Sequence, residues 1–158
     1  MCLKLTGKNF LLLICLLICG SCKKDTAGSL SRTALLTSGT WKLTAVTFHG
    51  DWDGDGIIDP VDTDLYNQTD ACTKDNLMIY HADGAGMYDE GADKCDGAPQ
   101  TLSFSWSFYN PYTGNIDENV IKFDNLGFEA LSIVELSTAT LKVKNIVSGG
   151  FQLYTYSH

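Results

Sequence analysis

Apolar and polar side chains alternate along much of the chain after residue 40, which is the pattern of β-strands. The alternation is clearest in segment 101–109. Four bulky apolar side chains share one face of this segment: Leu102, Phe104, Trp106 and Phe108. Because successive side chains of a strand point to opposite faces, the segment predicts a strand with one buried and one solvated side.

Seven further segments predict strands with less contrast. They are residues 41–48, 76–81, 86–89, 119–124, 129–136, 140–145 and 151–156. An Asp83-Gly84 turn joins the second and third of these as a hairpin. One or two helical turns are expected over residues 31–36, and no segment is long enough for a crossover helix. The pattern therefore predicts an all-β fold, either a closed antiparallel meander or a sandwich.

The same alternation predicts which side chains face inward and which face outward. Besides the row on segment 101–109, the inward ones are Trp41, Leu43, Leu77, Ile79, Ile121, Phe123, Leu141, Val143 and Leu153. The outward aromatic ones are Tyr109, Tyr112, Tyr154 and Tyr156. An eight-stranded barrel is just wide enough to be filled by side chains or to hold one small ligand. The bulky inward residues favour filling, and a cavity is the alternative. In that case the candidate ligand-binding residues are Trp41, Leu43, Phe104, Trp106 and Phe108.

The first 21 residues have a different pattern. Lys4 and Lys8 precede an apolar run over residues 10–19, and two small residues follow it. This order is typical of a secretory signal peptide, and the run is shorter than the roughly 18 residues that a membrane span needs. The next residue, Cys22, resembles the cysteine of the bacterial lipoprotein box, which receives a lipid and becomes the mature N-terminus.

The resemblance at Cys22 implies a protein attached to the bacterial cell envelope. We expect a signal peptide over residues 1–21, a lipidated tether over 22–34 and one domain over 35–158. An anchor of several acyl chains is stable, whereas a single chain binds only marginally. Lys23 differs from the aspartate of inner-membrane retention signals, which favours the outer membrane, on its periplasmic or surface face. A cleaved signal peptide without a lipid is the alternative.

Cysteine usage fits an exported domain. Of six cysteines, three lie within the leader and Cys22 takes the lipid, which leaves Cys72 and Cys95. Two thiols in an oxidising compartment most readily form a disulfide. A metal-thiolate site is disfavoured because no histidine or further cysteine lies at zinc-ligand spacing.

The charge balance narrows the class of partner. The chain has 11 basic and 19 acidic residues, and removal of the leader takes away Lys4 and Lys8. Such an acidic body disfavours nucleic acid and a bare anionic membrane as partners. The membrane contact is therefore expected through the lipid, and the sequence identifies no protein partner.

Segment 51–62 has the spacing of a calcium-binding loop. Its candidate ligands are Asp51, Asp53, Asp55, Ile57 through its carbonyl oxygen, Asp59 and Asp62. Alternate residues direct oxygen atoms to one centre, and Gly56 allows the sharp bend. Asp62 is shorter than the usual bidentate glutamate and no helices flank the loop, so we expect a weak structural Ca²⁺ site with a Kd of about 0.1–1 mM. An acidic solvated turn is the alternative.

Catalytic chemistry has little support in the sequence. His49, His81 and His158 are far apart, and the chain has no nucleophile elbow and no metalloprotease helix motif. We therefore expect a protein that is not an enzyme and uses no organic cofactor.

Three motifs together point to one family. They are Gly39-Thr40-Trp41, Cys72-Thr73-Lys74-Asp75 and Asp89-Glu90-Gly91-Ala92-Asp93-Lys94-Cys95. They resemble the lipocalin-like domain of Bacteroidetes-type lipoproteins, over roughly residues 35–156. The resemblance implies an eight-stranded antiparallel up-and-down barrel, with Trp41 at its closed end. The later Thr-Asp-Tyr and Arg signatures of lipocalins are absent, so the ligand preferences of those proteins are not carried over.

Two functions of different classes follow from these observations. The first is a lipid-anchored envelope protein whose barrel binds a small or lipidic ligand. The alternative is a structural or accessory lipoprotein, whose filled barrel docks a protein or glycan partner.

Overall fold

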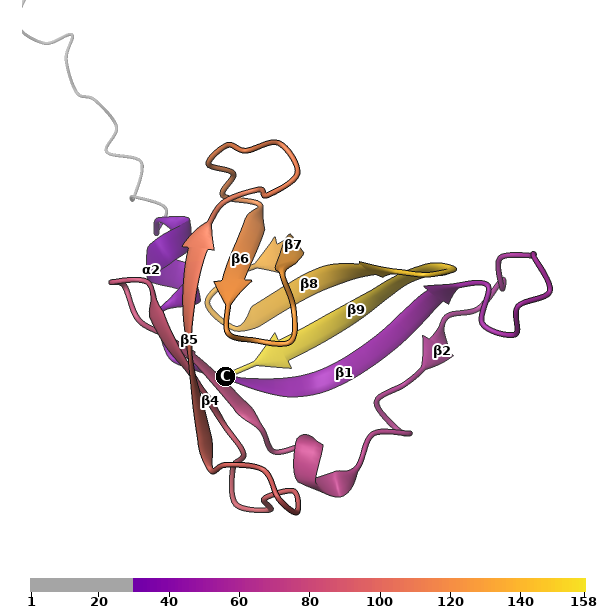
Figure 1. Cartoon of the computed structure of the whole chain (residues 1–158), viewed down its shortest axis with the longest axis horizontal. Helices are drawn as coiled ribbons and strands as arrows, with labels where there is room; N and C mark the ends of the chain where they lie inside the picture. Colours follow the sequence, from indigo (N-terminus) through magenta and orange to yellow (C-terminus); the bar gives the residue numbers. More distant parts are fainter. Residues whose placement is uncertain (1–29) are drawn as a thin grey trace, which may run out of the picture.

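The computed structural model describes residues 30–158 and shows a closed antiparallel β-barrel (Figure 1). Its eight strands are β1 (Thr40–Gly50), β3 (Leu77–Tyr80), β4 (Ala85–Asp89), β5 (Thr101–Phe108), β6 (Val120–Asp124), β7 (Ala130–Leu136), β8 (Thr140–Val147) and β9 (Gly150–Ser157). Strands that are consecutive in this series pair with one another, and β9 pairs with β1 to close the sheet. The predicted barrel is confirmed, and the sandwich alternative is wrong. The signal peptide, Cys22 and most of the tether lie outside the described residues.

A ninth, very short strand lies beside the barrel. β2 (Thr63–Asp64) pairs with Thr47 and Phe48 in the second half of β1. The sequence did not predict β2, because two residues are too few to show any periodicity. A register shift between Leu43 and Ala45 also changes which β1 side chains face inward, so that Phe48 is buried.

A short helix packs against the barrel beside the start of β1, as predicted for residues 31–36. Ser31 caps α2 (Arg32–Leu36) by accepting a hydrogen bond from a backbone N–H of its first turn. Leu36 is fully buried, and its carbonyl oxygen accepts a 2.8 Å hydrogen bond from Nε1 of Trp41. His158 stacks on Trp41 with ring centroids 3.8 Å apart. Within residues 30–158, no helix is both long enough and apolar enough to cross a membrane.

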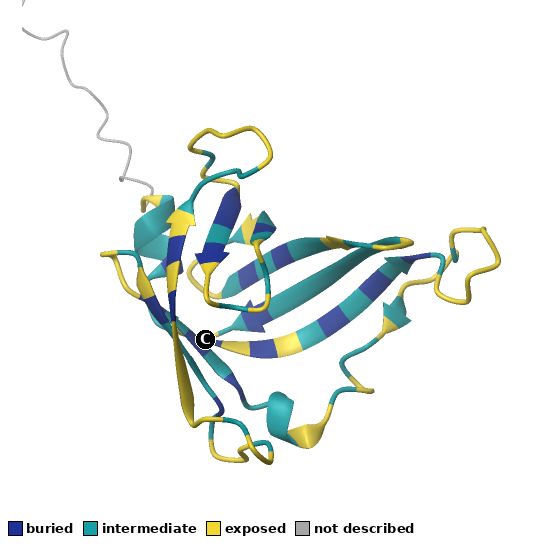
Figure 2. Cartoon of the chain, viewed as in Figure 1, coloured by how far each residue is buried: buried dark blue, intermediate teal, exposed yellow. Residues whose placement is uncertain are grey.

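Four aromatic side chains fill much of the barrel interior, and we call them the aromatic core: Tyr80, Phe104, Trp106 and Phe123. The ring of Tyr80 lies edge-on to those of Phe104 and Trp106, with centroids 5.7 Å apart in both pairs. Phe104 meets Phe123 in the same way at 5.8 Å. Edge-to-face contact is a favoured arrangement of aromatic pairs. Figure 2 shows buried positions alternating with others along the barrel strands.

The side chains that were predicted inward but do not lie in the core are Leu77, Ile79, Leu102 and Leu153. All residues of β3 are apolar or aromatic, so alternation does not reveal the phase, and Met78 and Tyr80 take the inward positions. Leu102 lies at the start of β5 and is 41% exposed. The outward predictions for Tyr154 and Tyr156 are also wrong, because Tyr156 is buried and Tyr154 packs half-buried against the core. A tyrosine has a large apolar ring with one polar tip, so polarity alone does not place it.

The predicted disulfide between Cys72 and Cys95 is confirmed, with Cα atoms 5.1 Å apart. It joins the 3₁₀ helix η1 (Ala71–Thr73) to the connection between β4 and β5. The crosslink therefore holds two long connections together at the side of the barrel that carries β3 and β4.

Candidate functional site

The barrel interior contains a cavity of about 140 Å³ next to the aromatic core. Its lining residues come from β1, η1, the connection between η1 and β3, β3, β4, β9 and the turn between β6 and β7: Leu43, Thr73, Asn76, Met78, Tyr88, Leu126, Phe128, Tyr154 and Tyr156. None of these side chains is ionised at neutral pH, and most are apolar or aromatic. The cavity is therefore suited to an uncharged, largely apolar group.

Two cross-strand pairs form the main walls of the cavity. Leu43 on β1 lies opposite Tyr156 on β9. Met78 on β3 lies opposite Tyr88 on β4 in the same manner. Residues directly opposite each other on paired strands share one face of a sheet, so each pair presents both side chains to the interior. The barrel register thus brings together four residues that are far apart in the sequence.

The turn between β6 and β7 supplies another wall. Phe128 meets Tyr154 on β9 in a T-shaped contact, with ring centroids 5.6 Å apart. Leu126 precedes it on the same turn, and both turn residues are half-buried. Because they lie outside the regular strands, they form the part of the lining that a substitution can alter with the least effect on the barrel.

A buried amide stabilises the wall beside η1. Asn76 is 5% exposed. In the orientation in which its nitrogen faces two carbonyl oxygens, the amide donates to those of Cys72 and Glu90 at 2.9 and 3.0 Å. The Asn76 oxygen then accepts the hydroxyl hydrogen of Tyr88. All hydrogen-bonding groups of the amide are engaged, so this side chain acts as a brace and not as a free ligand group.

The three tyrosine hydroxyls of the cavity differ in their partners. Tyr88 donates to Asn76, and Tyr154 donates to Oε1 of Gln152 at 2.6 Å. The hydroxyl of Tyr156 has no hydrogen-bond partner among the described residues, although this side chain is only 7% exposed. Burial raises the pKa of Tyr156 well above its ordinary value, and the neighbouring Tyr154 and Tyr88 add to the increase. Tyr156 is therefore a neutral phenol at physiological pH.

Of the five predicted ligand-binding residues, Leu43 alone lines the cavity. Trp41 lies fully buried beside Leu36 and His158. Phe104 and Trp106 belong to the aromatic core, and Phe108 packs on Trp106 with ring centroids 5.3 Å apart. The tyrosines and Met78 were not predicted, because the more hydrophobic phase of each strand was expected to face inward. The alternation of tyrosines on β9 is the sequence pattern that could have identified them as inward residues.

A second candidate site lies in residues 51–62, which we call the acidic loop. It projects from the end of β1, on the opposite side of the molecule from α2 in Figure 1. Carboxylate oxygens of Asp51, Asp53 and Asp55 lie within 4.8 Å of one another. Asp51 also accepts backbone hydrogen bonds from Gly54 and Gly56, at 2.7 and 2.8 Å. Both glycines have positive φ, of 79° and 87°, which allows the chain to fold round this carboxylate.

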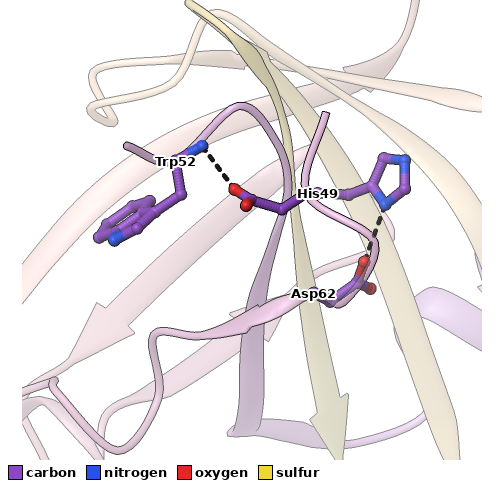
Figure 3. Close-up of polar contacts among 4 residues, drawn as sticks. His49, Trp52 and Asp62 are labelled. Carbon is purple, nitrogen blue, oxygen red and sulfur yellow. Dashed lines mark hydrogen bonds and ion pairs between the residues drawn. The ribbon is translucent and has the colours of Figure 1, made fainter. Parts of the chain in front are cut away.

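Asp59 and Asp62 form hydrogen bonds with other residues, whereas Ile57 bonds to one of these three aspartates. Asp59 accepts the backbone N–H of Trp52 at 2.8 Å, and Oδ1 of Asp62 lies 2.8 Å from Nδ1 of His49 (Figure 3). The backbone N–H of Ile57 donates to Asp55. The structure thus brings together three of the six predicted ligands, and the fit to a cation rests on Asp51, Asp53 and Asp55. Three carboxylates at this spacing are hard oxygen ligands of the kind Ca²⁺ prefers.

Comparison with known proteins adds no relative. No family model matches the chain, and no curated protein matches it. The likeness to lipocalin-like lipoprotein domains therefore stays a prediction that rests on the motifs quoted above.

Proposed function

We propose that this protein is a lipid-anchored lipoprotein of the bacterial cell envelope, whose barrel binds a small apolar ligand or the apolar end of a lipidic one. The observation that carries the proposal is the cavity of about 140 Å³ in an interior that aromatic side chains otherwise fill. Uncharged lining residues make the burial of an apolar group favourable, by roughly 25 cal/mol for each Å² removed from water.

The cavity volume limits the size of the group that enters. A cavity of about 150 Å³ is large enough for one benzene ring. Sites for drug-sized molecules are larger, at roughly 300–1,000 Å³. We therefore propose that one ring or a short chain end enters the cavity. Any longer part of the ligand would extend past Leu126 and Phe128, the half-buried residues of the β6–β7 turn.

Binding is testable with a fluorescent acyl probe and with toluene as a competitor. The experiment uses the chain from Lys23 to His158, which contains every strand of the closed barrel. Saturable probe binding and its displacement by toluene are expected. Leu126→Trp should abolish both because the larger side chain occupies the cavity, whereas Val134→Trp, at an exposed position on β7 outside the cavity lining, should change neither. No saturable binding by the unmodified chain would refute the proposed ligand.

The anchor is tested separately, by metabolic labelling with palmitate in the producing bacterium. Cys22→Ala should remove the label because that thiol is the proposed attachment point. Cys19→Ala is the matched control, since it removes a nearby cysteine that lies before the cleavage point, and it should leave the label in place. Label retained by Cys22→Ala would contradict the proposed anchor.

A docking role is the second candidate function, because the acidic loop exposes apolar side chains. Ile57 is 68% exposed and Val61 is 77% exposed, and Trp52 and Ile58 are exposed as well. Exposed apolar residues that cluster on one segment are typical of interaction sites. A photo-crosslinker in place of Ile57 should give a discrete adduct in intact cells if this candidate holds. The same crosslinker in place of Val134 is the control, and equal patterns at both positions would contradict the docking role.

We also propose that the acidic loop binds Ca²⁺ through Asp51, Asp53 and Asp55, as a structural ion. The support is the proximity of the three carboxylates, whose mutual repulsion a cation would remove. The ion would hold the exposed residues of the loop in one conformation, which links this proposal to the docking role.

A further inference from the structure

We infer that the group bound inside the barrel is a neutral single ring that carries one hydrogen-bond acceptor, such as a hydroxyl or carbonyl oxygen, and that the hydroxyl of Tyr156 binds this acceptor. The inference rests on the proposed function, because it specifies the chemical class of ligand for the same cavity. It adds a polar specificity contact that the apolar lining alone does not provide.

The hydroxyl of Tyr156 lacks a protein partner in the described part of the chain. Tyr156 is 7% exposed and lines the cavity, and its hydroxyl has no hydrogen-bond partner in residues 30–158. Among the described residues, the buried side-chain atom without a partner is Oδ1 of Asp75, so the Tyr156 hydroxyl is accessible from the cavity. A few polar groups placed in a largely apolar pocket are what fix the orientation of a ligand. A ligand oxygen in the cavity would supply the missing partner.

The other tyrosine hydroxyls and the amide of the lining already have partners. The hydroxyl hydrogens of Tyr88 and Tyr154 are donated to Asn76 and Gln152, and the Asn76 amide is fully engaged. The Thr73 hydroxyl lies 3.7 Å from the sulfur of Cys95, at the edge of the cavity. Within the described lining, Tyr156 is thus the tyrosine whose donor remains free for a ligand.

The described cavity lining carries no charged side chain. The lining contains no lysine, arginine or histidine that could pair with a ligand carboxylate, and no acidic residue that could pair with a cation. An unpaired ion is strongly disfavoured in such surroundings. Burial also keeps Tyr156 protonated by raising its pKa, so its hydroxyl remains a donor. The part of the ligand inside the barrel is therefore uncharged.

Phenol and toluene test the inference, because they have nearly the same shape and differ in one hydroxyl group. Their dissociation constants are measured by ligand-observed NMR on the Lys23–His158 chain and on Tyr156→Phe. We expect Tyr156→Phe to weaken phenol binding by about five- to tenfold, the usual value of one net hydrogen bond, and to leave toluene binding unchanged. Tyr156→Phe should fold normally, because it removes only an oxygen atom that has no protein partner.

Tyr154→Phe is the matched control. This tyrosine also lines the cavity, but its hydroxyl already donates to Gln152, so phenol affinity should remain that of the unmodified chain. Benzoate tests whether a charged ligand can enter the cavity, and it should show no saturable binding. Equal effects of Tyr156→Phe on the affinities for phenol and toluene would overturn the inference. Tighter binding of benzoate than of phenol would overturn it as well. Both outcomes would leave the proposed function intact. Failure of both phenol and toluene to bind would overturn the proposed function and this inference with it.

Discussion

The two halves of the barrel interior use the same kind of residue to opposite effect. In the aromatic core, the rings of Tyr80, Phe104, Trp106 and Phe123 contact one another and leave little space. Around the cavity, Phe128 contacts Tyr154, but the lining residues together enclose about 140 Å³ of empty space. The difference lies in which strands supply the rings. The aromatic content of a barrel therefore does not determine whether its interior is filled or contains a cavity.

Removal of one aromatic ring from each half should give the largest difference in stability. Phe104→Ala should lower the free energy of unfolding by about 3–5 kcal/mol, because it leaves a cavity in a packed core. Phe128→Ala should cost about 1 kcal/mol, since that side chain is half-buried and already borders open space. Urea unfolding monitored by circular dichroism gives both values. Equal losses would show that the two halves are packed alike.

Loss of the disulfide should have the next largest effect. Cys72→Ser combined with Cys95→Ser should lower the free energy of unfolding by about 3 kcal/mol, from the chain-entropy model for a loop of this length. The cavity should respond more than the aromatic core, because η1 carries Thr73 and borders Asn76 in the cavity wall. Probe titration on the double variant tests this, and unchanged affinity would show that the hydrogen bonds of Asn76 hold the wall alone.

Alkaline pH should destabilise the protein through its buried phenols. Burial raises the pKa of Tyr80 and Tyr156 in the folded state above the value near 10 of the unfolded chain. The folded state therefore retains protons that the unfolded state releases, and stability is lost as the pH rises above about 10. Each such tyrosine contributes a slope of about 1.4 kcal/mol for each pH unit.

The variant Tyr156→Phe separates the cavity from the core in this titration. It removes one of the buried phenols. The unfolding free energy should therefore decrease less between pH 10 and pH 11, by the amount that one tyrosine contributes. Urea unfolding at several pH values measures the slope. An unchanged slope would mean that the Tyr156 phenol ionises as readily in the folded chain as in the unfolded one.

Calcium should have a small effect on stability, and its site lies outside both halves of the barrel interior. With a Kd of about 1 mM, 10 mM Ca²⁺ should add about 1.4 kcal/mol, or roughly 5 °C in Tm. Asp53→Asn should remove the shift, and Asp96→Asn, which changes an exposed aspartate outside the acidic loop, should retain it. Scanning calorimetry with Ca²⁺ and with chelator measures the difference. Identical curves would leave the loop as an acidic turn.

The fold was predictable because strand positions depend on the local alternation of apolar and polar side chains, which can be read from the sequence. All eight barrel strands lie close to the predicted segments, and the Cys72–Cys95 disulfide was found by elimination. The phase of β3 was not predictable, since apolar residues occupy all of its positions. The cavity was missed for a different reason. It depends on how Leu43, Tyr156 and the β6–β7 turn meet across the barrel, and strand register decides this, not the pattern within one strand.

The candidate metal site was predictable only in part. Spacing identified Asp51, Asp53 and Asp55 correctly as neighbours, because they lie on one tight turn. It did not foresee that Asp62 would lie beside His49, since that contact follows from the pairing of β2 with β1. Local motifs are thus reliable over a few residues and fail where the sheet sets the neighbours.

The unequal burial of the three tryptophans has a practical consequence for spectroscopy. Trp41 and Trp106 are shielded from solvent, whereas Trp52, on the acidic loop, is 51% exposed. A water-soluble quencher such as acrylamide or iodide should therefore extinguish the red-shifted emission of Trp52 first. The protein carries an intrinsic optical reporter on this loop, and its wavelength will reveal any ion or partner that shields the indole, without an added dye.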